Sequence, residues 1–377
     1  MNTTRITLHA FLKTLSPLHI ASPGNMRLNT DTMEVTYGDS GGVPCTGVQK
    51  LAVYGTNGQI TNVPVIAANN VMGRLRRHAA SKVFDVLAAK GQRVTIQTYS
   101  ALTCGAVTGK PDGRDVTFDE YRESRAHPYI GLFGGGPRMM RRYVRGFNAV
   151  PVMEVTRCMF ERVKHPNLDW ASHSVSGDGS RGDARKLLGR WIFNRNDDLR
   201  DLVNMSQAAA SIESFESQII ERQSLILSDR KSNDEGEGSS RHSTKTFSAF
   251  EFVIPGVVFP LSFELDVTKA QLGLFLLALD SFAQLERLGG HARNGLGQFS
   301  LSDVVVEGEP GQILASGLFH ESRLQQEQEF VAEHLAAWAT ATADITGTDL
   351  DRLFAPPAEK TEKTDKKGKK AAVAAGA

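Results

Sequence analysis

A long apolar helix, a glycine-rich loop and an alternating strand follow one another directly between Thr268 and Glu307. The loop, LGGHARNGLGQF, also carries His291, Arg293 and Asn294. Glycine permits positive φ and a close approach of the backbone to a ligand, while the polar side chains supply hydrogen-bond donors. We therefore predict a loop that contacts a phosphodiester backbone. Its glycines are Gly289, Gly290, Gly295 and Gly297.

The composition indicates a globular chain with at least one full core. Of 377 residues, 41% are hydrophobic, enough for one large or two modest domains. The most apolar stretch contains Asp280, Glu286 and Arg287 and is too polar to span a bilayer, and no charged-then-apolar leader is seen. The three cysteines form no close pair, which fits a reducing compartment. We expect a cytoplasmic protein without membrane contact.

Positive charge gathers in two stripes, although the net charge is only +1. Residues 71–93 hold six basic residues and one acidic residue. Residues 138–164 hold seven basic residues and two acidic residues, so each stripe has a net charge of +5. A solvated helix face would interleave more acidic residues at i+4. The stripes favour a polyanion bound in a groove. We expect both of them to converge beside the glycine loop as one continuous track.

Periodicity predicts alternating strands and helices. The expected elements are a strand at 5–20, a helix at 70–89, a strand and irregular segment at 94–118, a hairpin at about 225–250, a helix at 268–288 and a strand at 297–307. Asn69 or Asn70 is the expected cap of the first helix. Residues 150–205 show no clear pattern. The order resembles a βαββαβ ferredoxin-like sheet with long insertions.

Several kinds of catalytic or cofactor chemistry have no matching motif. The segment GAVTGKP (105–111) has its glycines one residue too close for a phosphate loop, and Pro111 replaces the required Ser or Thr. Cys158, His165 and His173 share a window but lack zinc-site spacing. We expect no metal and no cofactor.

Four segments resemble motifs of the RAMP superfamily of CRISPR effector proteins, and within it the backbone subunit of the "Cas seven" type. They occur in the order expected for that family over most of the chain. The version in type IV effector complexes is the most similar. The segments are LSPLHIASPG (15–24), VPVIAANNVMGRLRRHA (63–79), GLFGGG (131–136) and LERLGGHARNGLGQF (285–299).

The resemblance implies an α+β fold with a ferredoxin-like, RRM-like palm, a hairpin thumb and a helical fingers region. A single domain would span 1–355, with a disordered Lys-rich tail at 356–377. The palm would be built from about 1–20, 63–150 and 250–310. The insertion at 150–250 would include the thumb at about 225–250.

The resemblance also implies a non-catalytic role. Copies would stack along a CRISPR guide RNA and leave guide bases exposed for a target, with DNA expected rather than RNA, and other effector subunits would be partners. Tyr143 and Phe147 are candidates for base stacking. The predicted RNA-binding residues are Asn69, Asn70, Arg74, Arg76, Arg77, Arg141, Arg142, Gly289, Gly290, His291, Arg293 and Asn294.

Three alternatives remain at this point. A type III-like backbone subunit would cleave target RNA through Asp31. A guide-processing endoribonuclease of the same superfamily would use His9 or His19 as a general base. An unrelated RNA-binding module would act as a monomer.

Overall fold

The fold is that of a computed structural model, which describes residues 2–24, 26–38, 42–55, 58–105, 117–136, 140–174, 184–195 and 246–354. The predicted Lys-rich tail at 356–377 lies outside these ranges. So does most of the predicted hairpin at about 225–250.

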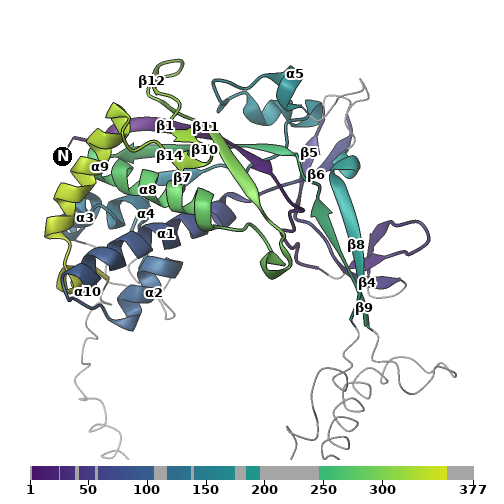
Figure 1. The fold of residues 1–377 in the computed structure, drawn as a ribbon, viewed down its shortest axis with the longest axis horizontal. Coiled ribbons are helices and arrows are strands. Elements are labelled where there is room, and N and C mark those ends of the chain that lie inside the picture. Colours follow the sequence, from purple (N-terminus) through teal and green to yellow (C-terminus); the bar gives the residue numbers. More distant parts are fainter. Residues whose placement is uncertain are drawn as a thin grey trace, which may run out of the picture.

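A five-stranded antiparallel sheet, here called the palm sheet, forms the centre of the fold (Figure 1). Helix α1 (Ala68–Ala89) separates β1 from β7 in sequence, and α8 (Lys269–Leu285) separates β10 from β11. This is the βαββαβ order with the first and third strands at the centre. The predicted ferredoxin-like α+β fold is confirmed. The strands run in the order β12 (Ile313–Ala315), β11 (Phe299–Glu307), β1 (Thr4–Thr14), β10 (Val258–Val267) and β7 (Val144–Gly146).

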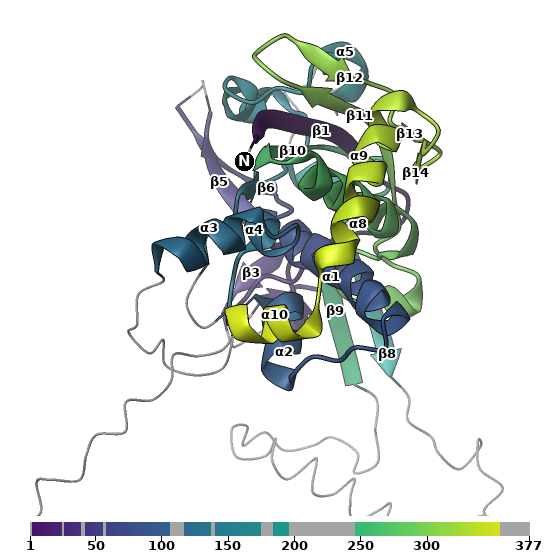
Figure 2. The ribbon, with the colours of Figure 1, turned by 90° about the vertical axis from the view of Figure 1, so that its left-hand side faces the viewer.

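The two crossover helices cover one face of the palm sheet, with α9 (Glu329–Ala341) packed against α8 (Figures 1 and 2). Leu8 and Leu12 of β1 are fully buried in the core there. Phe11 faces the other way and stacks on His165, with 3.9 Å between ring centroids. Residues 150–174 therefore cover the opposite face of the sheet at β1.

Helix α1 begins two residues before the predicted start, and the predicted asparagine cap is wrong. Its N-cap is Ala67, which has no side-chain cap. The free amide of Ala68 donates instead to the side-chain oxygen of Asn148, at 2.9 Å. Because this cap comes from 80 residues away, local sequence could not reveal it.

The predicted strand at residues 94–118 is also wrong, because α2 (Ile96–Cys104) occupies its first half. Thr95 caps this helix by accepting a hydrogen bond from the amide of Thr98, and Gly105 ends it in the left-handed conformation. The cap and the glycine stop override the strand preference of the β-branched residues in this segment.

A second five-stranded sheet projects from the palm (Figure 1). Strands β8 and β9 form a long hairpin, and β4 runs parallel to β9. The described part of the predicted hairpin thus belongs to β9, and its partner β8 comes from the region without a clear sequence pattern. The strands lie in the order β3 (Val35–Tyr37), β2 (Met26–Leu28), β4 (Val43–Thr46), β9 (Thr246–Val253) and β8 (Leu188–Arg195).

The remaining elements are short and lie around these two sheets. Within the described ranges, no helix combines the length and apolarity needed to cross a bilayer. The strands are β5 (Lys50–Tyr54), β6 (Ile60–Pro64), β13 (Phe319–His320) and β14 (Arg323–Leu324). The helices are α3 (Phe118–Ala126), α4 (Ile130–Phe133), α5 (Trp170–His173) and α10 (Gly347–Phe354), with 3-10 turns at Glu154–Phe160, Ala184–Leu187, Ala292–Asn294 and Thr342–Asp344.

Candidate nucleic-acid interface

The glycine loop packs against the chain segment that follows β1. The amide of Gly290 donates to the carbonyl of His19 at 2.7 Å, and the amide of Gly297 donates to the carbonyl of Pro17 at 2.9 Å. A Cβ on Gly289 would lie 2.0 Å from the His19 carbonyl oxygen. The approach of the His19 carbonyl requires glycine at position 289 for internal packing. The prediction that all the loop glycines serve a close ligand approach is therefore wrong for Gly289.

Gly297 also serves internal packing, whereas the tip of the loop is open. A Cβ on Gly297 would lie 2.0 Å from the carbonyl oxygen of Leu288, but one on Gly295 would meet no atom within 4 Å. Arg293 and Asn294 at the tip are exposed. The packed base of the loop holds a polar, cationic tip toward solvent.

His291 connects this loop to the second sheet. It has a positive φ of 59° and stacks on Phe250 of β9, with 4.5 Å between ring centroids and 16° between ring planes. Its ring also meets the edge of the His19 ring at 5.3 Å. The loop and β9 therefore share one surface.

Strands β8 and β9 present an aromatic face beside His291. Trp191 lies opposite Phe250 in the hairpin, and Phe193 lies opposite Ser248. Phe250 is buried, but Trp191 is 52% exposed and Phe193 is 38% exposed. Exposed rings on a paired strand offer stacking surfaces for unpaired bases. Neither ring was among the predicted RNA-binding residues, although their alternation in RWIFNR is a usable strand signal.

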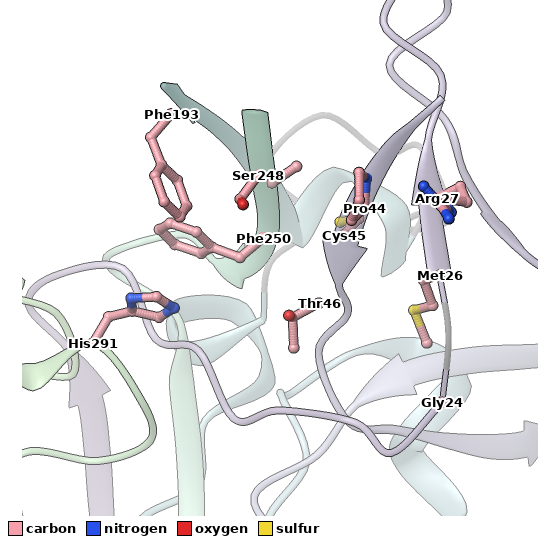
Figure 3. Close-up of a pocket in the computed structure, with 11 residues that line it drawn as sticks. Gly24, Met26, Arg27, Pro44, Cys45, Thr46, Phe193, Ser248, Phe250 and His291 are labelled. Atoms are coloured by element: carbon pink, nitrogen blue, oxygen red, sulfur yellow. The ribbon is translucent and has the colours of Figure 1, made fainter. Parts of the chain in front are cut away.

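A pocket of about 510 Å³ opens between this aromatic face and strands β2 and β4 of the second sheet. Figure 3 shows Phe193, Phe250 and His291 on one side and Arg27 and Pro44 on the other. The pocket combines aromatic rings, cationic groups and hydroxyls, which is a suitable lining for a nucleobase and its phosphate. Thr46 and Ser248 supply the hydroxyls.

Arg74 of α1 is joined to the beginning of the same loop. Its guanidinium forms an ion pair with Glu286 and donates to the carbonyl of Arg287 at 2.9 Å. His78 lies 3.2 Å from the other oxygen of Glu286. Burial raises the pKa of Glu286, but the hydrogen bond from His78 and the charge of Arg74 outweigh it and lower the pKa to about 2. The ion pair fixes α1 against the loop and offsets the charge of Arg74.

A family model of the RAMP superfamily matches residues 11–300, which is well over half of the chain. The chain belongs to the RAMP superfamily. A search of curated proteins finds no match.

Two solved structures are similar to this RAMP protein. A chain of a structure titled "Type IV-B CRISPR Complex" has a TM-score of 0.42 and 15% identity, covering 86% of this chain and 99% of that one. A chain of "Cryo-EM structure of the Type III-B Cmr-beta bound to cognate target RNA" has a TM-score of 0.35 and 11% identity, covering 81% of this chain and 61% of that one.

The other predicted residues of α1 divide between the interior and the surface of the RAMP fold. Arg76 donates to the carbonyls of Phe133 and Gly134, and its guanidinium lies 5.6 Å from the centre of the Phe133 ring. Arg77 and Asn69 are exposed, and Arg77 has no ion-pair partner within the described ranges. Arg76 therefore holds the LFG segment together, and Arg77 is the more available cation.

Arg141 and Arg142 lie far from the glycine loop. They precede Val144, which pairs with Leu265 beside the start of β1, whereas the loop contacts the segment beyond the end of β1. At about 3.3 Å per residue, this separates them by roughly 35 Å. The predicted convergence of both basic stripes on the loop is wrong for the second stripe. The order and direction of the strands decide where Arg141 and Arg142 lie, and the charge pattern of the sequence does not reveal it.

The two candidate base histidines are buried and bonded within the protein. His9 lies 3.0 Å from the hydroxyl of Ser262 and 3.2 Å from Glu307, and His19 lies 2.6 Å from the carbonyl of Glu251. Burial lowers the pKa of His9 and of His19, against the opposing effect of these partners. His9 has a partner on each ring nitrogen, and His19 has a partner on Nδ1.

Asp31 occupies the exposed turn between β2 and β3. Its amide is bonded to the side-chain oxygen of Asn29 at 2.8 Å, and its carboxylate makes no ion pair within the described residues. In the part of the chain that the structure describes, no group of three or more His, Cys, Asp or Glu side chains is arranged to hold a metal ion.

Proposed function

We propose that this RAMP protein is a non-catalytic backbone subunit of a CRISPR effector complex, which oligomerises along guide RNA and presents guide bases for target pairing. One observation carries the proposal. The cationic glycine loop and the aromatic face of β8 and β9 line a single pocket, joined by the stacking of His291 on Phe250. Its partners would be guide RNA, a target nucleic acid, further copies of itself and other subunits of the complex.

The pocket and the exposed side chains of the glycine loop and β8 together supply the two interactions that sequence-independent binding of single strands requires. Arg293 at the loop tip and Arg27 of β2 provide positive charge for phosphates. The exposed rings of Trp191 and Phe193 provide stacking, which every base can use. A subunit that must accept any guide sequence needs this kind of contact rather than base-specific hydrogen bonds.

A non-catalytic role is supported by how the candidate catalytic residues are used. His9 and His19 are buried, and both ring nitrogens of His9 and the Nδ1 of His19 bond to groups of the same chain. Asp31 lies on an exposed turn without a histidine or second carboxylate bonded to it in the described structure. General acid and base chemistry would need at least one such group to reach the substrate.

Assembly on guide RNA tests the proposal directly. We expect protein mixed with guide RNA to grow in discrete subunit steps by light scattering, and to stay small without RNA. Trp191→Ala and Phe193→Ala should each weaken RNA binding roughly tenfold, since stacking contributes about 1–3 kcal/mol per base. Phe118→Ala is the matched control, because this ring on α3 is 74% exposed but lies outside the pocket.

Two results would contradict the proposal. A protein that binds RNA but remains a monomer would be a simple RNA-binding module. Periodic cuts in a matched RNA target with Mg²⁺, abolished by Asp31→Ala, would make the subunit an enzyme.

A further inference from the structure

A second basic hollow lies at the end of the palm sheet that is far from the glycine loop. It has a volume of about 200 Å³. Arginines reach it from two strands on either side of β10, because β1 and β7 both pair with that strand. The residues that line it include Arg5, Arg141, Arg142, Arg145, Tyr143 and Glu264.

The hollow carries more positive charge than its own acidic residues can offset. Four arginines face two carboxylates, those of Glu264 and Asp266, which leaves +2. Asp266 is already paired with Arg125, at 3.3 Å. Within the described ranges, none of the four arginines forms an ion pair with a carboxylate. Clustered guanidinium groups without partners repel one another, and a bound anion relieves that repulsion.

The floor of the hollow is held in place by contacts around Tyr143. The guanidinium of Arg125 lies 3.6 Å from the centre of the Tyr143 ring, and that of Arg141 lies 5.2 Å from it. The Tyr143 hydroxyl is hydrogen bonded to Tyr121. The ring is therefore already in contact with two cations.

These contacts select the class of ligand. A protein partner or a nucleotide pocket needs an apolar or aromatic anchor, but Tyr143 is occupied and Leu265 is only 1% exposed. A phosphate contact needs no such anchor, and arginine binds phosphate through two parallel hydrogen bonds. We propose that this hollow is a second phosphate-binding site, which holds the backbone of a single-stranded nucleic acid other than the strand on the glycine loop.

The test measures binding of a labelled oligothymidine to protein already loaded with guide RNA, by fluorescence anisotropy over a range of salt. Arg141→Ala/Arg142→Ala should weaken binding by roughly tenfold and lower the salt slope by about 1.4, at about 0.7 for each phosphate contact. Glu264→Gln should strengthen binding by roughly two- to fivefold, because it removes an uncompensated negative charge. A gain of affinity cannot result from misfolding.

Arg323→Ala is the matched control, because this exposed arginine on β14 lies outside the hollow and should leave binding unchanged. If guide RNA does not load, the same titration on the protein alone, in an Arg293→Ala/Trp191→Ala/Phe193→Ala background that weakens the first site, still reports on the hollow. Unchanged binding in the double variant, or no gain with Glu264→Gln, would overturn the inference. Displacement of the oligothymidine by polyglutamate at equal charge would overturn it in favour of an acidic protein partner.

Discussion

The ring of His291 lies 4.5 Å from that of Phe250 and almost parallel to it, although all of β10 and α8 lie between the two residues in the chain. This stack makes one surface from a loop at the end of the palm and a strand of the second sheet. Binding at the pocket therefore depends on how these two parts are held together.

Replacing His291 tests the stack itself. His291→Ala should weaken guide RNA binding by roughly three- to tenfold, because an aromatic pair contributes about 0.5–1.5 kcal/mol and positions the loop. His291→Phe should restore most of the affinity, since it keeps a flat ring against Phe250. If the Phe variant binds as poorly as the Ala variant, the imidazole acts through hydrogen bonding or charge. A filter-binding titration distinguishes these results.

The variant Glu286→Gln distinguishes the role of Glu286 in positioning Arg74 and His78 from the electrostatic effect of its negative charge on RNA binding. Removing a negative charge beside an RNA site should strengthen binding if only electrostatics matters, but we expect weaker binding because Glu286 holds Arg74 and His78 against the loop. Parallel measurements of RNA affinity and of urea unfolding would record both effects. Stronger binding by the variant would show that the ion pair does not position the loop.

The stability contributed by Glu286 should depend on pH. Its pKa falls from an ordinary 4.5 to about 2 in the folded protein. A carboxyl group with a lowered pKa stabilises the fold fully above its unfolded pKa, and that stability is lost as the pH falls through the folded value. The difference in unfolding free energy between the wild type and Glu286→Gln should thus be constant above pH 5 and shrink between about pH 4.5 and 2. A difference that does not change over this window would contradict the assignment.

Alanine substitutions at two loop glycines should have different costs. Gly295 has a φ of +81° but open space, so Gly295→Ala should cost about 1–2 kcal/mol of unfolding free energy. Gly289→Ala should cost more, because its Cβ would also lie 2.0 Å from a backbone oxygen. Chemical denaturation of both variants measures the difference. Equal costs would mean that the loop can move away from His19 freely.

Neighbouring arginines on α1 should give opposite phenotypes. Arg76→Ala should lower the unfolding free energy by about 1–3 kcal/mol by leaving the carbonyls of Phe133 and Gly134 without their donor. Arg77→Ala should leave stability unchanged but reduce the salt slope of RNA binding by about 0.7. The two variants serve as controls for each other, and a reversed pattern would show that Arg76 faces the RNA.

The palm could be predicted because it depends on short-range patterns. The spacing of apolar residues predicted α1 and α8, and the order of strands and helices predicted the βαββαβ sheet, since periodicity reports directly on which face of an element is buried. The glycine loop was also evident from the four glycines within LGGHARNGLGQF. Two of its glycines, however, serve internal packing, which only the approach of the His19 and Leu288 carbonyls reveals.

Tertiary structure alone decided which charged and aromatic residues are available to a ligand. Arg74 and Glu286 are 212 residues apart in the chain, and Arg76 finds its carbonyls 57 and 58 residues away, so no local pattern marks one arginine as paired and Arg77 as exposed. Likewise, the sequence shows that residues 138–164 are basic but not that strand order sends Arg141 to the opposite end of the sheet. The spacing of apolar residues is set within one segment of the chain and can be read from the sequence. The partners of a side chain are set by the packing of segments that are distant in sequence.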